Sequence, residues 1–369
     1  MTAPRTDAAG PHTAAVADDA LHGSYCPKMC SFACPVTSAT GRDDAVPWSF
    51  HRTVSDLAAG RLPLVPAVAG RLTACSGCLA CQVPCAFDQD VPAQVRAGRA
   101  ALVDAGAAPV LVADAVAAVD AGRAPTGTDL PELPASEDEA GTVIVAGCRD
   151  DSASLHAAVA LLRAAGERVA VRVPEGCCGA LLDDLGARDA ADRARTRVAD
   201  LVPATAETVV ANDPHCLGSL RAAGIETTDL ATHLGTAVAD GRLTFTAGDE
   251  RSVTWHDPCV LARGEGVTDA PRRLLTAAGA SLVEPEHHAR HTACSGAGMG
   301  MDQLDPDAAD ATADARVREL GAGPVVTGCA RAAERLRARG ADVTDLASAL
   351  VTHLAGSPSS PSDPERRSP

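Results

Sequence analysis

The chain has 369 residues, of which 46% are hydrophobic and 2% aromatic, and its formal net charge is −16. This length predicts two or three domains, and the composition is that of a globular protein packed mainly with Ala, Val and Leu. The acidic balance, with Lys28 as the single lysine, argues against nucleic acid or an anionic lipid surface as a partner. The longest apolar stretch, 109–119, contains Asp114 and is far too short for a transmembrane segment, so we expect none.

The N-terminal third contains two runs of cysteines, preceded by a stretch, 1–21, that lacks apolar periodicity and is predicted to be disordered. The second run has C-x2-C-x2-C-x3-C spacing and comprises Cys75, Cys78, Cys81 and Cys85. This spacing lets three thiolates bind one iron–sulfur cube while the fourth binds a neighbouring cluster. Zinc ligands usually come as pairs from two separate loops, so the run favours 4Fe–4S clusters over zinc.

The first run has C-x3-C-x3-C-P spacing and comprises Cys26, Cys30 and Cys34. If the last cysteine of each run ligates the cluster of the other run, one 4Fe–4S cluster has four thiolates. These are Cys34, Cys75, Cys78 and Cys81. The second cluster has only three, from Cys26, Cys30 and Cys85. Three interpretations of the second site stay open: a 3Fe–4S cluster, a non-cysteine ligand such as His22, or no cluster.

The spacing of Ala, Val and Leu around and after these runs predicts helices over 48–59, 93–104 and 110–121. We therefore expect 22–122 to be an α-helical ferredoxin-type domain. The segment 123–141 is rich in proline, glycine and acidic residues, which is typical of a linker.

Beyond the linker, short β-rich runs alternate with helical ones, which predicts βαβ units and parallel sheets. This region is an internal repeat, with copies at 142–247 and 250–355. The block that starts at Val209 aligns without a gap with the block that starts at Val325. The predicted fold is α+β and multidomain, a helical domain followed by two α/β repeats, with a disordered tail at 356–369.

Cysteines recur at equivalent places in the two copies. The first copy has four, Cys148, Cys177, Cys178 and Cys216. The second copy has three, Cys259, Cys294 and Cys329. Because ligands of parallel α/β sheets gather at the carboxyl ends of the strands, we expect each copy to bring its thiols to one pocket. We interpret them as ligands of an iron–sulfur cluster or of zinc, although single cysteines often pack simply as small hydrophobic residues.

Two further motifs in the second copy are weaker signals. His287, His288 and His291 resemble a ligand group but are more typical of a solvated turn. The glycine run at 296–300 lacks the spacing of a nucleotide-binding loop, and close backbone approach to a cluster explains its glycines equally well.

On these motifs the chain resembles the cysteine-rich iron–sulfur subunits related to heterodisulfide reductase. That family includes the iron–sulfur subunits of glycolate oxidase, of lactate-utilisation systems and of anaerobic glycerol-3-phosphate dehydrogenase. The resemblance covers roughly 22–355 and rests on two ferredoxin-type runs, followed twice by a single cysteine, a Cys-Cys-Gly and a C-x2-C pattern. Besides the altered first run, Asp213, Ser295 and Ala332 stand where the family has cysteine, so a disulfide-cleaving cluster in the second copy is not expected.

The resemblance implies an electron-transfer subunit of an oxidoreductase. Its partner would be a flavoprotein dehydrogenase acting on a hydroxy acid or polyol phosphate, and its acceptor a quinone or a thiol/disulfide carrier. The sequence has no flavin or nicotinamide fingerprint, so we expect it to need such a partner. Clustered thiols without a hydrophobic leader indicate a cytoplasmic protein, peripheral to a membrane only through its partner. Two alternatives stay open: a zinc-stabilised interaction protein with degenerate repeats, and a direct disulfide reductase.

Overall fold

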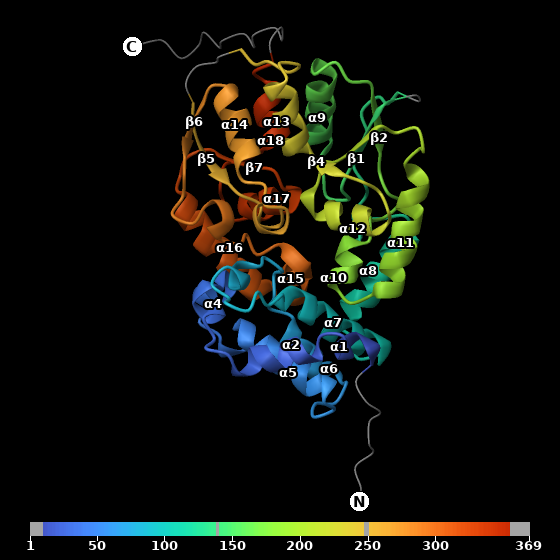
Figure 1. Ribbon diagram of the computed structural model, residues 1–369, viewed down its shortest axis with the longest axis vertical. Coiled ribbons are helices and arrows are strands. Elements are labelled where there is room, and N and C mark those ends of the chain that lie inside the picture. The colour runs from blue at the N-terminus through green and yellow to red at the C-terminus, as the bar shows by residue number, and fades with distance from the viewer. Residues whose placement is uncertain (1–9, 138–139, 247–250, 355–369) are drawn as a thin grey trace, which may run out of the picture.

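The computed structural model describes residues 10–137, 140–246 and 251–354. Figure 1 shows a helical N-terminal part beneath two α/β lobes that stand side by side. Each lobe contains a four-stranded parallel sheet, in the order β2-β1-β3-β4 in the first and β6-β5-β7-β8 in the second. The prediction of two α/β repeats with parallel sheets is therefore confirmed. The predictions for 1–9 and for 356–369 lie outside the described residues.

The N-terminal part, 10–122, is built from helices. They are α1 (Pro11–Ala14), α2 (Ala17–Tyr25), α3 (Cys30–Ala33), α4 (Pro35–Thr40), α5 (Pro47–Ala58), α6 (Pro66–Ala69), α7 (Val91–Asp104) and α8 (Val110–Asp120). The three predicted helices correspond to α5, α7 and α8. Contrary to the predicted disorder, 10–21 contains α1 and most of α2, because α2 packs against α5 and buries Ala20 completely. One small buried face is too weak a pattern to reveal such a helix in sequence.

The first repeat alternates strands and helices as predicted. Its elements are β1 (Thr142–Val145), α9 (Ser152–Ala164), β2 (Val169–Arg172), α10 (Ala180–Asp184), α11 (Arg188–Leu201), β3 (Thr208–Ala211), α12 (Leu217–Ala222), β4 (Thr228–Asp229) and α13 (Leu230–Ala239). Strand β1 is buried along its whole length, as expected for an inner parallel strand covered on both faces.

The second repeat has the same order of strands. Its elements are β5 (Arg251–His256), α14 (Asp269–Ala277), β6 (Ala280–Val283), α15 (Met301–Leu304), α16 (Pro306–Leu320), β7 (Val325–Thr327), α17 (Ala330–Ala338), β8 (Val343–Asp345) and α18 (Leu346–Val351). A single π-helical turn at Val260–Gly264 follows β5.

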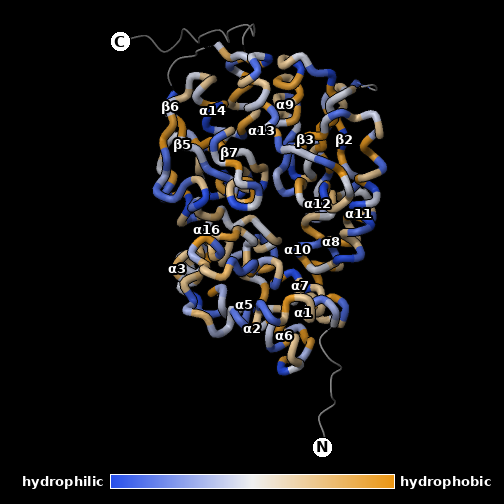
Figure 2. The backbone as a smooth tube through the Cα atoms, viewed as in Figure 1, coloured by the Kyte–Doolittle hydropathy of each residue, from blue (hydrophilic) through white to orange (hydrophobic). Residues whose placement is uncertain are grey.

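The two repeats pack against each other in a reciprocal way. Helix α9 of the first contacts α18 of the second, and α13 of the first contacts α14 of the second. One hydrophobic cluster joins the lobes and includes Ile144 and Val210 from one sheet, with Trp255 and Val326 from the other. Apolar residues follow the strands and the inner faces of the helices (Figure 2). Burial of this shared core indicates that the repeats fold as a pair.

Arg99 of α7 is buried between all three parts and helps to attach the N-terminal part. Its guanidinium donates to the carbonyl oxygens of Leu72 at 2.7 and 3.0 Å, of Asp184 at 2.8 Å and of Met299 at 2.8 Å. Helix α16 also packs against α4. These contacts bring the N-terminal cysteines next to the second repeat.

Candidate metal centres

Four N-terminal thiols line one cavity. We call these residues the four-thiol set; they are Cys34, Cys75, Cys78 and Cys81. Cys34 directly precedes α4, and the other three lie on a tight loop in which Gly77 and Leu79 have φ values of +67° and +57°. All four side chains are buried. The structure thus brings together the four cysteines that would share one cluster if the last cysteine of each run ligates the cluster of the other run.

The environment of the four-thiol set suits a cationic centre. Burial raises the pKa of Cys75 to about 12, and it raises the pKa values of Cys34 and Cys81 as well. Neighbouring thiols of the set add to each increase, because thiolates placed close together repel. A bound metal ion reverses this repulsion, since ligating thiols are held as thiolates. The buried Arg99 guanidinium acts in the same direction on Cys75.

A second N-terminal cavity is lined by the remaining cysteines of this part. We call Cys26, Cys30 and Cys85 the three-thiol set. Burial raises the pKa of Cys30 to about 11, and the thiols of Cys26 and Cys85 contribute to the increase. Cys81 and His51 also line this cavity. His22, which the sequence suggests as a ligand, instead packs against Phe87, with ring centroids 4.2 Å apart.

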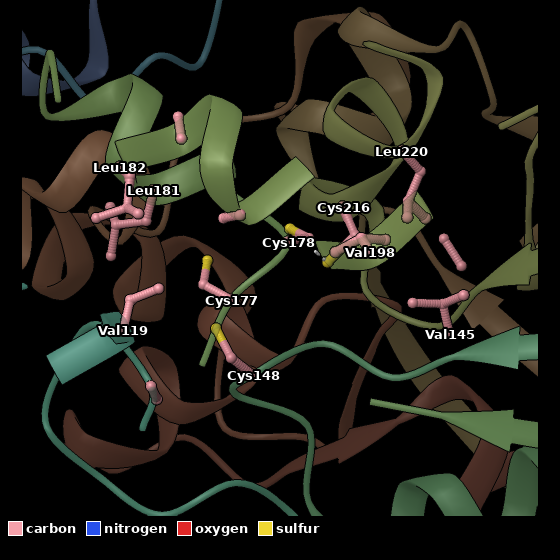
Figure 3. Packing of buried hydrophobic residues seen from close by; sticks show 14 of the residues in the cluster. Val119, Val145, Cys148, Cys177, Cys178, Leu181, Leu182, Val198, Cys216 and Leu220 are labelled. Carbon is pink, nitrogen blue, oxygen red and sulfur yellow. Dashed lines mark hydrogen bonds between the residues drawn. The ribbon is translucent and has the colours of Figure 1, made fainter. Parts of the chain in front are cut away.

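The first repeat brings its four cysteines together at the carboxyl ends of three strands. Cys148 follows β1, Cys177 and Cys178 follow β2, and Cys216 follows β3. The Cys178 thiol donates to the Cys216 sulfur at 3.2 Å. The four side chains, from three separate loops, gather in one region in Figure 3. We call them the first-repeat set.

The thiols of the first-repeat set differ in the direction of their pKa shifts. Hydrogen bonding to Cys177, together with burial, raises the pKa of Cys148 well above its usual range. Hydrogen bonds from Cys148 and Cys178 lower the pKa of Cys177 well below its usual range, and Arg331 lowers it further. Arg331 comes from α17 of the second repeat and is only 3% exposed. Sequence reasoning missed it, because no motif indicates that the second repeat provides a charge to the first.

The second repeat divides its three cysteines between two places, whereas the sequence predicts one pocket for each copy. Cys294 lies in a buried cluster with Cys78 of the four-thiol set, and the half-buried Cys259 packs against them. The Cys294 thiol donates to Ser76 Oγ at 3.3 Å, and hydrogen bonding to Cys259, with burial, raises the pKa of Cys294 to about 12. The second repeat and the N-terminal part thus share this site.

Cys329 instead lies beside Asp213 and His215 of the first repeat. Its sulfur, a carboxylate oxygen of Asp213 and a ring nitrogen of His215 all lie within 4.8 Å of one another. Burial and the nearby Arg331 lower the pKa of His215 to about 4, which leaves its imidazole neutral. The reciprocal packing explains this arrangement, because Asp213 and Cys329 occupy equivalent positions after β3 and β7.

Two larger cavities are each lined by one cysteine of the second repeat. A cavity of about 310 Å³ between the repeats is lined by Cys329 together with Arg149, Asp150 and Glu334. A cavity of about 730 Å³ lies between the N-terminal part and the second repeat, and Cys294 lines it. Its basic lining residues are Arg263, Arg290, Arg316, Arg318, His287 and His291. Glu319 also lines this cavity and pairs with Arg316 at 2.8 Å and with His287 at 3.1 Å, while Arg263 donates to backbone carbonyl oxygens. The exposed side chains of Arg290 and Arg318 are suited to an anionic ligand.

Comparison with known proteins identifies the repeated region. The model of the cysteine-rich (CCG) domain matches twice, over residues 143–221 and 253–331. A subunit of the dihydromethanophenazine-dependent CoB–CoM heterodisulfide reductase of Methanosarcina mazei is 29% identical over 205 residues, which is 50% of this chain and 49% of that protein. A probable membrane-anchored ferredoxin of Chromohalobacter salexigens is 37% identical over 102 residues, 27% of this chain and 15% of that protein.

A third relative is the EtfAB:quinone oxidoreductase of Syntrophomonas wolfei, 39% identical over 75 residues, 20% of this chain and 10% of that protein. The chain thus spans about half, or much less, of the length of these relatives. Within the described residues, no helix has both the length and the apolar character needed to cross a membrane. The chain thus contains two cysteine-rich (CCG) domains and is similar in sequence to a heterodisulfide reductase subunit and to a ferredoxin.

Proposed function

We propose that the chain is the iron–sulfur electron-transfer subunit of an oxidoreductase complex. The observation that carries this proposal is the adjacency of the four-thiol set and the three-thiol set, whose cavities share Cys81. A structural zinc site needs four ligands and does not require a second group of thiols beside it. Two adjoining thiol sites in one buried region are what stepwise electron transfer requires.

The four-thiol set and the three-thiol set are proposed to hold two clusters, the first 4Fe–4S and the second incomplete in cysteine. The first-repeat set is proposed to hold a further cluster or zinc. Bound there, an iron–sulfur cluster accepts and returns one electron at a time. The protein buries these thiols except Cys26 and Cys85, which are half-buried, and Arg99 and Arg331 provide positive charge beside two of the ligand sets.

The electron donor is proposed to be a flavoprotein dehydrogenase that acts on a hydroxy acid or polyol phosphate. Three large apolar side chains at the three-thiol set are at least half exposed: Met29 and Phe87, which line its cavity, and Tyr25, which precedes Cys26. Exposed apolar patches on folded proteins commonly mark docking sites. This patch supports docking of the partner over the three-thiol set.

The acceptor is proposed to be a quinone or a thiol/disulfide carrier. The cavity beside Cys294 supports the second type, because its arginines suit a carrier with carboxylate or phosphate groups. Direct disulfide reduction at a repeat cluster is a second candidate function, and the first-repeat set, which keeps four thiols, is the candidate place for it. A chemically reduced preparation that fails to turn over any anionic disulfide would reject that candidate.

Anaerobic purification, iron and sulfide analysis and low-temperature EPR test the main proposal. We expect brown protein with EPR signals from reduced clusters, and loss of one cluster in Cys78→Ser. A colourless protein with stoichiometric zinc would overturn the proposal and favour the zinc-stabilised interaction protein. The Asp213, His215 and Cys329 group supports that alternative, since these side chains are common zinc ligands.

A further inference from the structure

The cavity of the three-thiol set contains a histidine that the sequence does not single out. His51 lies on α5 and lines this cavity together with Cys26, Cys30 and Cys85. Its side chain is buried, with 2% of the residue exposed. A buried histidine beside three thiols is well placed to replace a missing fourth cysteine, because imidazole and thiolate are both common ligands of iron and zinc.

A chain of hydrogen bonds fixes which ring nitrogen of His51 is free. Gln94 Nε2 donates to Gln89 Oε1 at 3.0 Å, so the Gln94 amide turns its Oε1 toward the histidine. His51 Nδ1 lies 2.6 Å from that Oε1 and therefore carries the ring proton. Among the described residues, Nδ1 makes the ring's only hydrogen bond. Nε2 is left with its lone pair, the form in which histidine binds metal.

The ring is also held in position by close packing. A Cβ on Gly23 would overlap the Cγ and Nδ1 atoms of the His51 ring, so the glycine allows α2 to pass directly over it. Burial lowers the pKa of His51 and so favours the neutral ring. The amide pair and the glycine together fix both the tautomer and the position of the ring.

We propose that His51 Nε2 is the fourth ligand of the three-thiol set, which makes this a Cys3His cluster site. This inference rests on the proposed function, because it presumes that the N-terminal part binds clusters. Cys81 is a poorer candidate, since its use here would leave the four-thiol set one ligand short. Ser24 lies two residues before Cys26, but its hydroxyl donates to the carbonyl oxygen of Ala20 at 2.8 Å.

The ligand difference has a consequence for electron transfer. A neutral imidazole in place of a thiolate makes the bound cluster less negative, and such substitution is associated with a higher reduction potential. The cluster at the three-thiol set should therefore have a higher reduction potential than the cluster of the four-thiol set. His51→Cys should lower the first potential and leave the second unchanged.

Nitrogen hyperfine spectroscopy tests the ligand directly. The full-length protein is purified anaerobically with ¹⁵N-labelled histidine, reduced, and measured by pulsed EPR. We expect strong ¹⁵N coupling on one of two cluster signals. The coupling should disappear in His51→Cys, with both clusters retained, and persist in the control His22→Ala. In His51→Ala we expect loss of about half of the N-terminal iron, or conversion to a 3Fe–4S signal.

The outcomes separate this inference from the proposed function. Two clusters without histidine coupling, in a folded protein whose potentials do not change in His51→Cys, would overturn the ligand assignment and leave the proposed function intact. Absence of any cluster, including that of the four-thiol set, would overturn both. If His51→Ala fails to fold, His51→Cys still decides, because it keeps a ligand at the same place.

Discussion

Gly298 of the second repeat lies in direct contact with the backbone of Ser76, which stands between Cys75 and Cys78 of the four-thiol set. A Cβ on residue 298 would overlap the carbonyl oxygen of Ser76. On the same loop, Cys294 donates to the Ser76 hydroxyl. Gly298 therefore allows close approach of the second repeat to the loop of Cys75 and Cys78, whereas Gly296 faces Ala309 and Gly300 faces Leu185.

Gly298→Ala should force these two loops apart. Overpacking of a tight buried contact typically costs about 1–3 kcal/mol, and we expect a decrease of this size in the free energy of unfolding. Chemical denaturation followed by circular dichroism measures it. The matched control is Gly323→Ala, where a Cβ would meet nothing within 4 Å. Equal stability of the two variants would contradict the contact.

Arg99→Met should weaken the junction of the three parts. Methionine has a similar length but cannot donate hydrogen bonds, so the carbonyl oxygens of Leu72, Asp184 and Met299 lose a partner. Buried groups left unpaired cost about 1–3 kcal/mol each, and we expect a loss of more than about 2 kcal/mol in stability together with faster proteolysis after 122. The exposed Arg71 provides the control, Arg71→Met. A wild-type proteolysis pattern for Arg99→Met would contradict the role of this junction.

Cys178→Ser and Cys329→Ser should differ in their effect on the first-repeat set. Cys178 contacts Cys216 directly, so its loss should remove the metal bound by this set. Cys329 lies with Asp213 and His215, so Cys329→Ser should leave that metal in place. Metal analysis of the full-length variants, combined with visible absorption, measures both effects. Equal metal loss in the two variants would mean that Cys329 belongs to the first-repeat set.

The sequence predicts the repeated sheets well, because their signals are local and occur twice. Apolar runs such as 143–146 and 209–211 correspond to β1 and β3, and the spacing of the cysteines leads to the four-thiol set that the fold assembles. The gapless match between the copies also places Asp213 opposite Cys329 in the alignment. These features depend on residues near one another in sequence or on a repeated pattern.

The remaining features depend on how separate elements meet, and no local pattern encodes this. Nothing in the sequence around Arg331 indicates that its side chain reaches thiols of the other repeat. His51 lies in an ordinary amphipathic helix, and only the packing of α5 beside the first cysteine run gives it a candidate role. Likewise, Cys259 and Cys294 lie beside Cys78 because the N-terminal part packs against the second repeat, and Cys329 lies beside Asp213 because the two repeats pack against each other.

Acid should weaken the first repeat through Glu167. This carboxylate accepts hydrogen bonds from Thr142 Oγ1 at 2.8 Å and from Arg242 Nη1 at 3.1 Å, and it lies 2.8 Å from His233 Nε2. Burial alone would raise the pKa of Glu167, but these hydrogen bonds and the charge on His233 lower it below its ordinary value. The group therefore links β1 to α13 most strongly when it is ionised.

The direction of the pH effect follows from that lowered pKa. An acid whose pKa is lower in the folded state contributes full stability above its unfolded pKa, which is about 4.3 for Glu, and loses it as the pH falls through the folded value. We expect unfolding free energies measured by denaturant titration to fall from about pH 5 down to the most acidic condition that keeps the protein soluble. Glu167→Gln, which cannot ionise, should be less stable than the wild type near neutral pH and should show a shallower decrease. A decrease of the same steepness in both proteins would mean that other carboxylates govern the acid sensitivity.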